Sequence, residues 1–298
     1  MSGTAQEEGQ AMLRGAKLAC KRIKRERKIL KNKKIEIIPY DDTNSQAAVG
    51  IASDIVNEDK VLCVLGHYSS SSSALAGSMY KSNGIPAITA SAAVDSVTQK
   101  NELFFRTILG DRTAIKFIIH GMQELPGISS KTTASMIYDA DLYNTTIEEF
   151  RKTAENIFDP LKIWSFHGDS DAKQDDLKKI IAEIRAEESV GPIFFATGSR
   201  DCRYLISGFR YPGTNYPIIG LESLSVPSFI RQEQPENGGY STDGTYALSP
   251  FISYLADQPE ALAFRKEFRR QYSKEPTWLA AAYYDAMLVA LNAAEPAE

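Results

Sequence analysis

Short apolar runs alternate with longer amphipathic stretches along most of the chain. The runs that predict strands lie at residues 34–39, 61–65, 84–89, 132–138, 192–197 and 217–220. Apolar residues recur at helical spacing at residues 45–59, 72–82, 113–122, 145–156 and 175–188. Strands that alternate with helices in this way predict an α/β fold, in which parallel sheets are joined by right-handed crossovers.

Two of these runs have distinctive patterns. Val61–Leu65 is continuously apolar, which is typical of a strand covered on both faces. The spacing of Leu177, Ile180 and Ile184 on one stripe makes 175–188 the clearest helix.

Polar or small residues follow four of the predicted strands. They are Ser69–Ser73, Thr89–Ala93, Asp139–Tyr143 and Glu222. Ligands of open parallel sheets bind beyond the carboxyl ends of the strands, so we expect these segments to converge on one cleft. The serine run leads directly into a helical pattern, and a helix N-terminus offers backbone N–H groups to an anion.

Composition narrows the class of protein. The chain has 298 residues, a length that suggests two domains, and 43% of them are hydrophobic. The formal net charge is -4, which disfavours general nucleic-acid binding. The basic run Lys21–Lys34 is interpreted as the exposed end of a helix and a loop. No apolar stretch approaches the length of a membrane span, so no direct membrane insertion is expected.

No cofactor or metal is expected. The cysteines are Cys20, Cys63 and Cys202, and their spacing matches no metal motif. Cys63 is interpreted as a small core residue, while pairing of Cys20 with Cys202 remains open. The three histidines are scattered, which disfavours a metal site, and no G-x-G-x-x-G follows a strand.

Catalysis finds little support in the pattern. Asp41 and Asp42 are adjacent, so their side chains point in opposite directions, and they are interpreted as turn and capping residues. His67 beside the serine run suggests a nucleophile and its base, but no G-x-S-x-G elbow is present. We therefore expect that the protein is not an enzyme. The alternative from another functional class is a serine-dependent hydrolase.

Several ordered segments resemble the periplasmic leucine/isoleucine/valine-binding family of type I solute-binding proteins. They are YDD at 40–42, VLCVLGHYSSS, GIPAITASAAVDSVTQ, FFRT at 104–107, YDADLY at 138–143, RYPGTNYPIIGLES at 210–223 and AAYYDAM at 281–287. The resemblance implies two Rossmann-like lobes joined by a multi-strand hinge. Lobe 1 is expected to take residues 1–111 and 247–298, and lobe 2 residues 112–246.

The resemblance also implies roles for the loops of lobe 1, which is expected to grip a ligand carboxylate. Ser70 matches the gripping hydroxyl, and Ser69 and Ser71 lie beside it. Ala92 matches the backbone carbonyl that receives the ligand ammonium. The remaining predicted ligand-binding residues of this lobe are Tyr68, Ser91 and Ala93.

Two residues of lobe 2 complete the implied site. Tyr143 matches the tyrosine that closes over the ligand, and Glu222 matches the acid that pairs with its ammonium. A zwitterion needs donors at one end and an acceptor at the other, and this arrangement supplies both. The faces of Tyr68 and Tyr143 are expected to cover the apolar part of the ligand.

The sequence departs from the family pattern in three places. Ala93 replaces a threonine hydroxyl, an aromatic residue near 197–199 is absent, and residues 1–3 align just after the family's first strand. We therefore expect either that the chain is a piece of a longer one or that the sheet is completed differently.

The function implied is extracytoplasmic binding of an amino acid or a related small amine-bearing acid. The expected partners are an ABC transporter permease or a receptor signalling partner, and the expected location is periplasmic or extracellular. An amide, urea-like or aromatic acid ligand is the alternative within the same fold.

Overall fold

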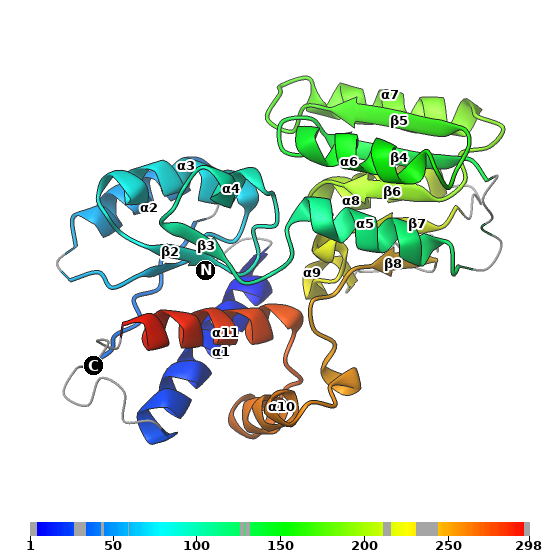
Figure 1. Cartoon of the computed structure of the whole chain (residues 1–298). Helices are drawn as coiled ribbons and strands as arrows, with labels where there is room; N and C mark the ends of the chain where they lie inside the picture. Colours follow the sequence, from blue (N-terminus) through cyan, green and yellow to red (C-terminus); the bar gives the residue numbers. More distant parts are fainter. Residues whose placement is uncertain are drawn as a thin grey trace, which may run out of the picture. The chain divides into compact units, whose positions relative to one another are not determined.

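Two parallel sheets, each packed with helices, form the two units of the chain (Figure 1). The computed structural model describes residues 5–26, 34–42, 45–58, 60–125, 128, 132–210, 216–230 and 244–294. Unit 1 takes Met1–Leu109 and Pro250–Glu298, and unit 2 takes Gly110–Ser249. The predicted α/β class with parallel sheets is confirmed.

Unit 1 is built on a three-stranded sheet in the order β1-β2-β3. Its strands are β1 (Val64–Leu65), β2 (Ala87–Thr89) and β3 (Phe104–Arg106). Its helices are α1 (Gln6–Glu26), α2 (Ser45–Val56), α3 (Ser70–Ser82), α4 (Ser96–Gln99), α10 (Pro259–Tyr272) and α11 (Trp278–Ala293), with a 3₁₀ turn at Ser253–Leu255. In Figure 1, α2, α3 and α4 lie on one side of the strands, and α1 and α11 lie on the other.

Helices α1 and α11 pack closely because small residues face each other. A side chain at Gly15 of α1 would overlap the backbone carbonyl of Ala280 in α11. Leu18 and Ile23 of α1 and Leu279 of α11 are buried in the same core. The last helix of the chain therefore belongs to the core beneath the first sheet.

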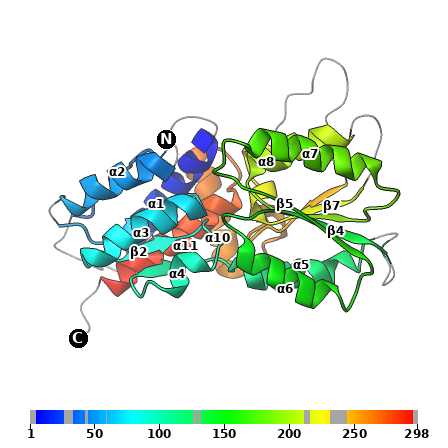
Figure 2. The same ribbon diagram turned by 90° about the horizontal axis from the view of Figure 1, so that it is seen from above.

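Unit 2 has a five-stranded parallel sheet in the order β5-β4-β6-β7-β8. Its strands are β4 (Ala134–Asp139), β5 (Leu161–Phe166), β6 (Ile193–Ala196), β7 (Ile218–Gly220) and β8 (Thr245–Ala247). Its helices are α5 (Asp111–Met122), α6 (Asn144–Ala154), α7 (Lys173–Ala186), α8 (Ser199–Arg210) and α9 (Pro227–Ile230), with a 3₁₀ turn at Glu222–Leu224. Figure 2 shows α7 and α8 on one face of the sheet and α5 and α6 on the other.

Two of the predicted strands differ in the structure. Residues 34–42 form no strand and belong to neither of the two described sheets. Only Val64–Leu65 of the run 61–65 forms a strand, and it pairs with β2 alone. Its side chains are half-buried, as an edge position allows, and Cys63 beside it is half-buried rather than in the core.

The basic run Lys21–Lys34 begins in the last turns of α1, where Lys21, Lys24 and Arg25 are exposed as predicted. The part of the run at 27–33 lies outside the described residues. None of the described helices combines the length and the apolar character needed to cross a membrane.

Candidate functional site

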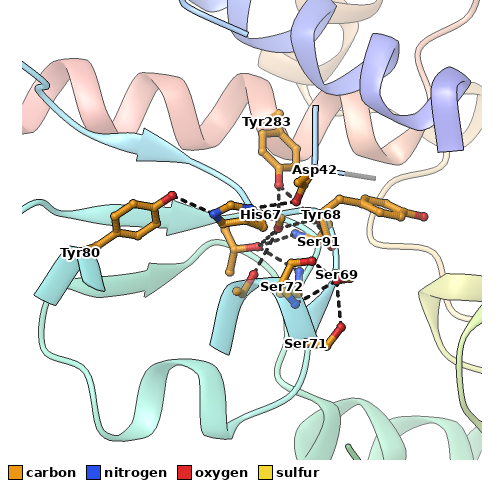
Figure 3. A network of polar contacts seen from close by, with 12 residues as sticks. Asp42, His67, Tyr68, Ser69, Ser71, Ser72, Tyr80, Ser91 and Tyr283 are labelled. Atoms are coloured by element: carbon orange, nitrogen blue, oxygen red, sulfur yellow. Dashed lines mark hydrogen bonds and ion pairs between the residues drawn. The ribbon is translucent and has the colours of Figure 1, made fainter. Parts of the chain in front are cut away.

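The serine run forms the cap and first turn of α3 (Figure 3). Ser69 has extended backbone, and its hydroxyl accepts a hydrogen bond from the Ser72 N–H at 3.1 Å. The same hydroxyl bonds those of Ser71 and Ser72, at 3.1 and 2.9 Å. The helix therefore begins at Ser70, two residues before the predicted start, because the Ser69 hydroxyl caps the first turn.

The loop after β2 lies against residues 67–71, which are called the serine loop below. The Ser91 hydroxyl donates to the Tyr68 carbonyl at 2.8 Å, and the Val94 N–H donates to the Ser70 hydroxyl at 3.3 Å. Ala92 is held by its N–H, which donates to the Thr89 hydroxyl at 3.0 Å. The predicted residues of unit 1, Tyr68 to Ser71 and Ser91 to Ala93, are thus brought together at the carboxyl ends of neighbouring strands.

Arg106 at the end of β3 fixes the second of these loops. Its guanidinium donates to the carbonyls of Ala93 and Val94, both at 3.0 Å, and to the Asp95 carboxylate at 2.6 Å. Both side chains of the ion pair are largely buried, at 12% and 16% exposure. A planar fork with several donors suits three acceptors at once, so Arg106 sets the path of the chain from Ala93 to Asp95.

The serine loop begins at His67, whose imidazole is buried between two partners. Nδ1 lies 2.8 Å from the Asp42 carboxylate and Nε2 lies 2.8 Å from the Tyr80 hydroxyl. An ionised carboxylate only accepts, so Nδ1 donates to Asp42, and in a neutral imidazole Nε2 then accepts from Tyr80. Burial, followed by the nearby Asp42 charge, raises the pKa of Tyr80, so its hydroxyl remains a donor.

This arrangement corrects the interpretation of Asp42 as a turn and capping residue. Its carboxylate orients a histidine 25 residues away. It also weakens the hydrolase alternative, because both ring nitrogens of His67 bond Asp42 and Tyr80 rather than a serine hydroxyl. Asp42, Tyr80 and Arg106 were missed as site-forming residues. Asp42 and Arg106 lie in the quoted segments YDD and FFRT, but the resemblance assigned neither of them a role, and Tyr80 had no such signal.

In unit 2, Tyr143 and Glu222 lie close enough for the carboxylate to affect the phenol. Tyr143 precedes α6 and its N–H donates to the Asp139 carbonyl at 2.9 Å, while Glu222 opens the 3₁₀ turn after β7. Both side chains are buried. Burial first, and then the charges of Glu222 and Asp111, raise the pKa of Tyr143 well above its ordinary value.

The loop that carries Tyr143 is held by two carboxylates. Asp139 accepts from the N–H groups of Asp141 at 3.0 Å and Gly168 at 3.1 Å. Desolvation by burial raises the pKa of Asp139 against the effect of these bonds. Asp141 in turn bonds Nδ1 of His167 at 2.7 Å. The strand ends of β4 and β5 are therefore joined through their loops.

Among the described residues, no group of three His, Cys, Asp or Glu side chains is arranged to hold a metal ion. Cys20, Cys63 and Cys202 all carry free thiols, so the structure contains no bond between Cys20 and Cys202. Burial raises the pKa of each of these thiols, to about 12 for Cys63. A thiol with a raised pKa is a poor nucleophile at neutral pH.

Comparison with known proteins identifies the family. A family model described as "Periplasmic binding protein" matches residues 1–298. The chain belongs to this family. The resemblance to its leucine/isoleucine/valine-binding members is thereby confirmed, and the periplasmic binding protein described here has the type I fold that the resemblance implied.

Two relatives of this periplasmic binding protein have established names. It is 26% identical to the "Leucine-, isoleucine-, valine-, threonine-, and alanine-binding protein" of Pseudomonas aeruginosa over 257 residues, covering 84% of this chain and 64% of the relative. It is 24% identical to the "Leu/Ile/Val-binding protein" of Escherichia coli over 309 residues, covering 100% of this chain and 79% of the relative. The chain thus spans about two thirds to four fifths of these relatives.

Solved structures show the same fold. The branched-chain amino acid transporter substrate-binding protein of Streptococcus pneumoniae, in complex with isoleucine, has a TM-score of 0.81 at 23% identity and covers 100% of this chain and 82% of its own. A solute-binding protein of an ABC transporter from R. palustris, in complex with benzoate, has a TM-score of 0.73 at 18% identity, with coverage of 100% and 83%.

Proposed function

We propose that this periplasmic binding protein binds an amino acid, or a related small amine-bearing acid, without catalysis. The observation that carries the proposal is the pairing of the serine loop with the loop after β2 at the N-terminus of α3. Helix dipoles favour a carboxylate at such a terminus, and hydroxyls there supply further donors. The named relatives that bind amino acids support this ligand class.

In this proposal residues of both lobes bind the ligand. Tyr68, Ser69, Ser70 and Ser71 face its carboxylate, with Ser91, Ala92 and Ala93 beside them. Tyr143 covers the ligand from lobe 2 and Glu222 pairs with its ammonium. The expected lobes, 1–111 with 247–298 and 112–246, move about their connections as the ligand is enclosed.

The protein would act outside the cytoplasm, in keeping with the family. It would deliver its ligand to an ABC transporter permease, or signal to a receptor partner.

The ammonium role of Glu222 is tested by calorimetry. Glu222→Ala should weaken binding of the preferred amino acid by about 1.5–3 kcal/mol, because it removes one charge-assisted bond. Glu155→Ala, at an exposed position of the same unit, is the matched control and should bind as the parent does. Equal affinity of Glu222→Ala and the parent would show that Glu222 does not hold the ammonium.

An aromatic acid is the second candidate ligand. Ala93 in place of a threonine, and the benzoate bound by a protein of the same fold, favour it. A thermal-shift screen of amino acids, their amides and aromatic acids separates the two. An aromatic acid lacks the ammonium, so its binding should not weaken in Glu222→Ala.

A further inference from the structure

The first two carbonyl oxygens of the serine loop accept hydrogen bonds from buried hydroxyls (Figure 3). The Tyr68 carbonyl accepts from Ser91 at 2.8 Å. The His67 carbonyl has four hydroxyls near it, at 3.2 Å (Thr89), 3.3 Å (Ser73), 3.4 Å (Ser91) and 3.5 Å (Tyr283). These hydroxyls come from α3, from β2 and its following loop, and from α11.

One consistent set of donors explains these distances. A serine hydroxyl has one proton, and the shortest contact of Ser91 gives that proton to the Tyr68 carbonyl. Tyr283 then donates to the Ser91 oxygen, 3.0 Å away, while Thr89 and Ser73 donate to the His67 carbonyl. Burial raises the pKa of Tyr283 to about 12, so this hydroxyl keeps its proton at neutral pH.

The buried side chain of His67 also holds the start of the serine loop. Asp42 and Tyr80 bond the two ring nitrogens, and the ring stacks on Tyr80 with centroids 5.8 Å apart. All of these residues belong to unit 1. The loop is therefore held at the carbonyl groups and at one buried side chain, and rotation of its peptides would break several bonds together.

The orientation of a peptide decides which charge it presents to a ligand. In a trans peptide the C=O of one residue and the N–H of the next point in opposite directions. The Tyr68 carbonyl turned towards Ser91 therefore turns the Ser69 N–H the other way. A carbonyl facing outward would repel a carboxylate, whereas an N–H attracts it and prefers it to an uncharged amide.

We propose that Tyr283 and Ser91 are positioning residues that set the preference of the serine loop for a carboxylate over an uncharged amide. The inference rests on the proposed function, since it assigns the carboxylate to this loop. Tyr283 acts through Ser91, which in turn holds the Tyr68 carbonyl.

The experiment compares two ligands that differ only in the group at the loop. Calorimetry identifies which amino acid or related small amine-bearing acid binds the parent best, and then measures that ligand and the amide of its carboxylate. Tyr283→Phe and Ser91→Ala should each reduce the ratio of the two dissociation constants about tenfold, the size of one lost charge-assisted bond.

Two further variants act as controls. Tyr284→Phe removes a neighbouring buried hydroxyl of α11 that accepts from Arg22 at 2.7 Å, and it should leave the ratio unchanged. Ser91→Thr retains a hydroxyl that can donate to the Tyr68 carbonyl, so it should retain the ratio. This rescue would show that the effect of Ser91→Ala comes from the lost hydroxyl and not from a folding defect.

Equal weakening of both ligands in Tyr283→Phe, with the ratio unchanged, would mean that the hydroxyl only supports the fold, and would overturn the inference while leaving the proposed function intact. A parent protein that binds no amino acid and no related small amine-bearing acid would overturn both.

Discussion

A single side chain, Arg106, holds the loop after β2 at three points. It bonds the Ala93 and Val94 carbonyls and the Asp95 carboxylate from the end of β3. Because the ion pair is largely buried, its loss is not compensated by water as it would be on the surface.

Arg106→Lys should therefore destabilise unit 1. A lysine keeps the charge but cannot serve three acceptors in one plane, so we expect the free energy of unfolding to fall by about 1–3 kcal/mol. Arg270→Lys changes an exposed arginine that pairs with Glu267, and should cost less than about 0.5 kcal/mol. Urea unfolding measures both, and equal effects would show that the three-acceptor geometry is unimportant.

The contact of His167 with Asp141 predicts how the stability of the fold depends on pH. Its hydrogen bond to Asp141 raises the pKa of His167 above 6.5 and lowers that of Asp141 below 3.8. A raised histidine pKa stabilises the fold fully below pH 6.5 and ceases to do so as the pH rises through the raised value. A lowered aspartate pKa stabilises it above pH 3.8 and ceases to do so as the pH falls through the lowered value.

NMR titration of His167 tests this contact. In Asp141→Asn the pKa of His167 should fall back towards 6.5, while Asp175→Asn, a carboxylate elsewhere in unit 2, should leave it raised. An unchanged His167 pKa in Asp141→Asn would show that the bond does not form in solution.

The sequence predicted the polar residues of the site better than the residues that hold them. The serine run and Ser91 were found because polar residues follow strands at one edge of a parallel sheet. Tyr283 lies 192 residues from Ser91 and is one of many buried residues of α11, so nothing in its local pattern separates it from a packing tyrosine. Contacts of that range depend on tertiary packing, which periodicity does not report.

Among the elements, the central strands were predictable and the edges were not. The strands β4, β6 and β7 are buried apolar runs bounded by turn residues, and this pattern identified them. Strand β5 was missed because it lies at the edge of its sheet, with five of its six side chains half-buried or exposed. The segment 34–39 shows the reverse error, because alternation alone does not supply a neighbouring strand.

The packing of α1 on α11 gives a prediction at this scale. Gly15→Ala places a methyl group against the Ala280 carbonyl, so the helices must separate, and we expect a loss of about 1–3 kcal/mol of stability. Gly50→Ala in α2 is the matched control, since nothing lies within 4 Å of its added carbon. It should stabilise by about 0.5–1 kcal/mol. Thermal unfolding measures both, and a neutral Gly15→Ala would show that α1 and α11 are not in tight contact.

At the scale of the whole molecule, the proposed site takes residues from both units. Each unit has its own sheet and core, so the ligand-free protein is expected to unfold in two calorimetric transitions. A ligand present at 100 times its dissociation constant should add about 2.7 kcal/mol and raise both transitions. The Glu222→Ala variant at the same ligand concentration should show a smaller shift. A ligand that raised only one transition would place the whole site within one unit.

Unit 1 is made of two chain segments, and this has a consequence for how the protein is made. The serine loop near residue 67 receives Tyr283 from α11, while unit 2 is one continuous segment between them. Domains fold during synthesis as their residues leave the ribosome. Unit 2 can therefore complete its sheet before α11 has been synthesised. Unit 1, although its first segment is made earlier, can complete its fold only after unit 2.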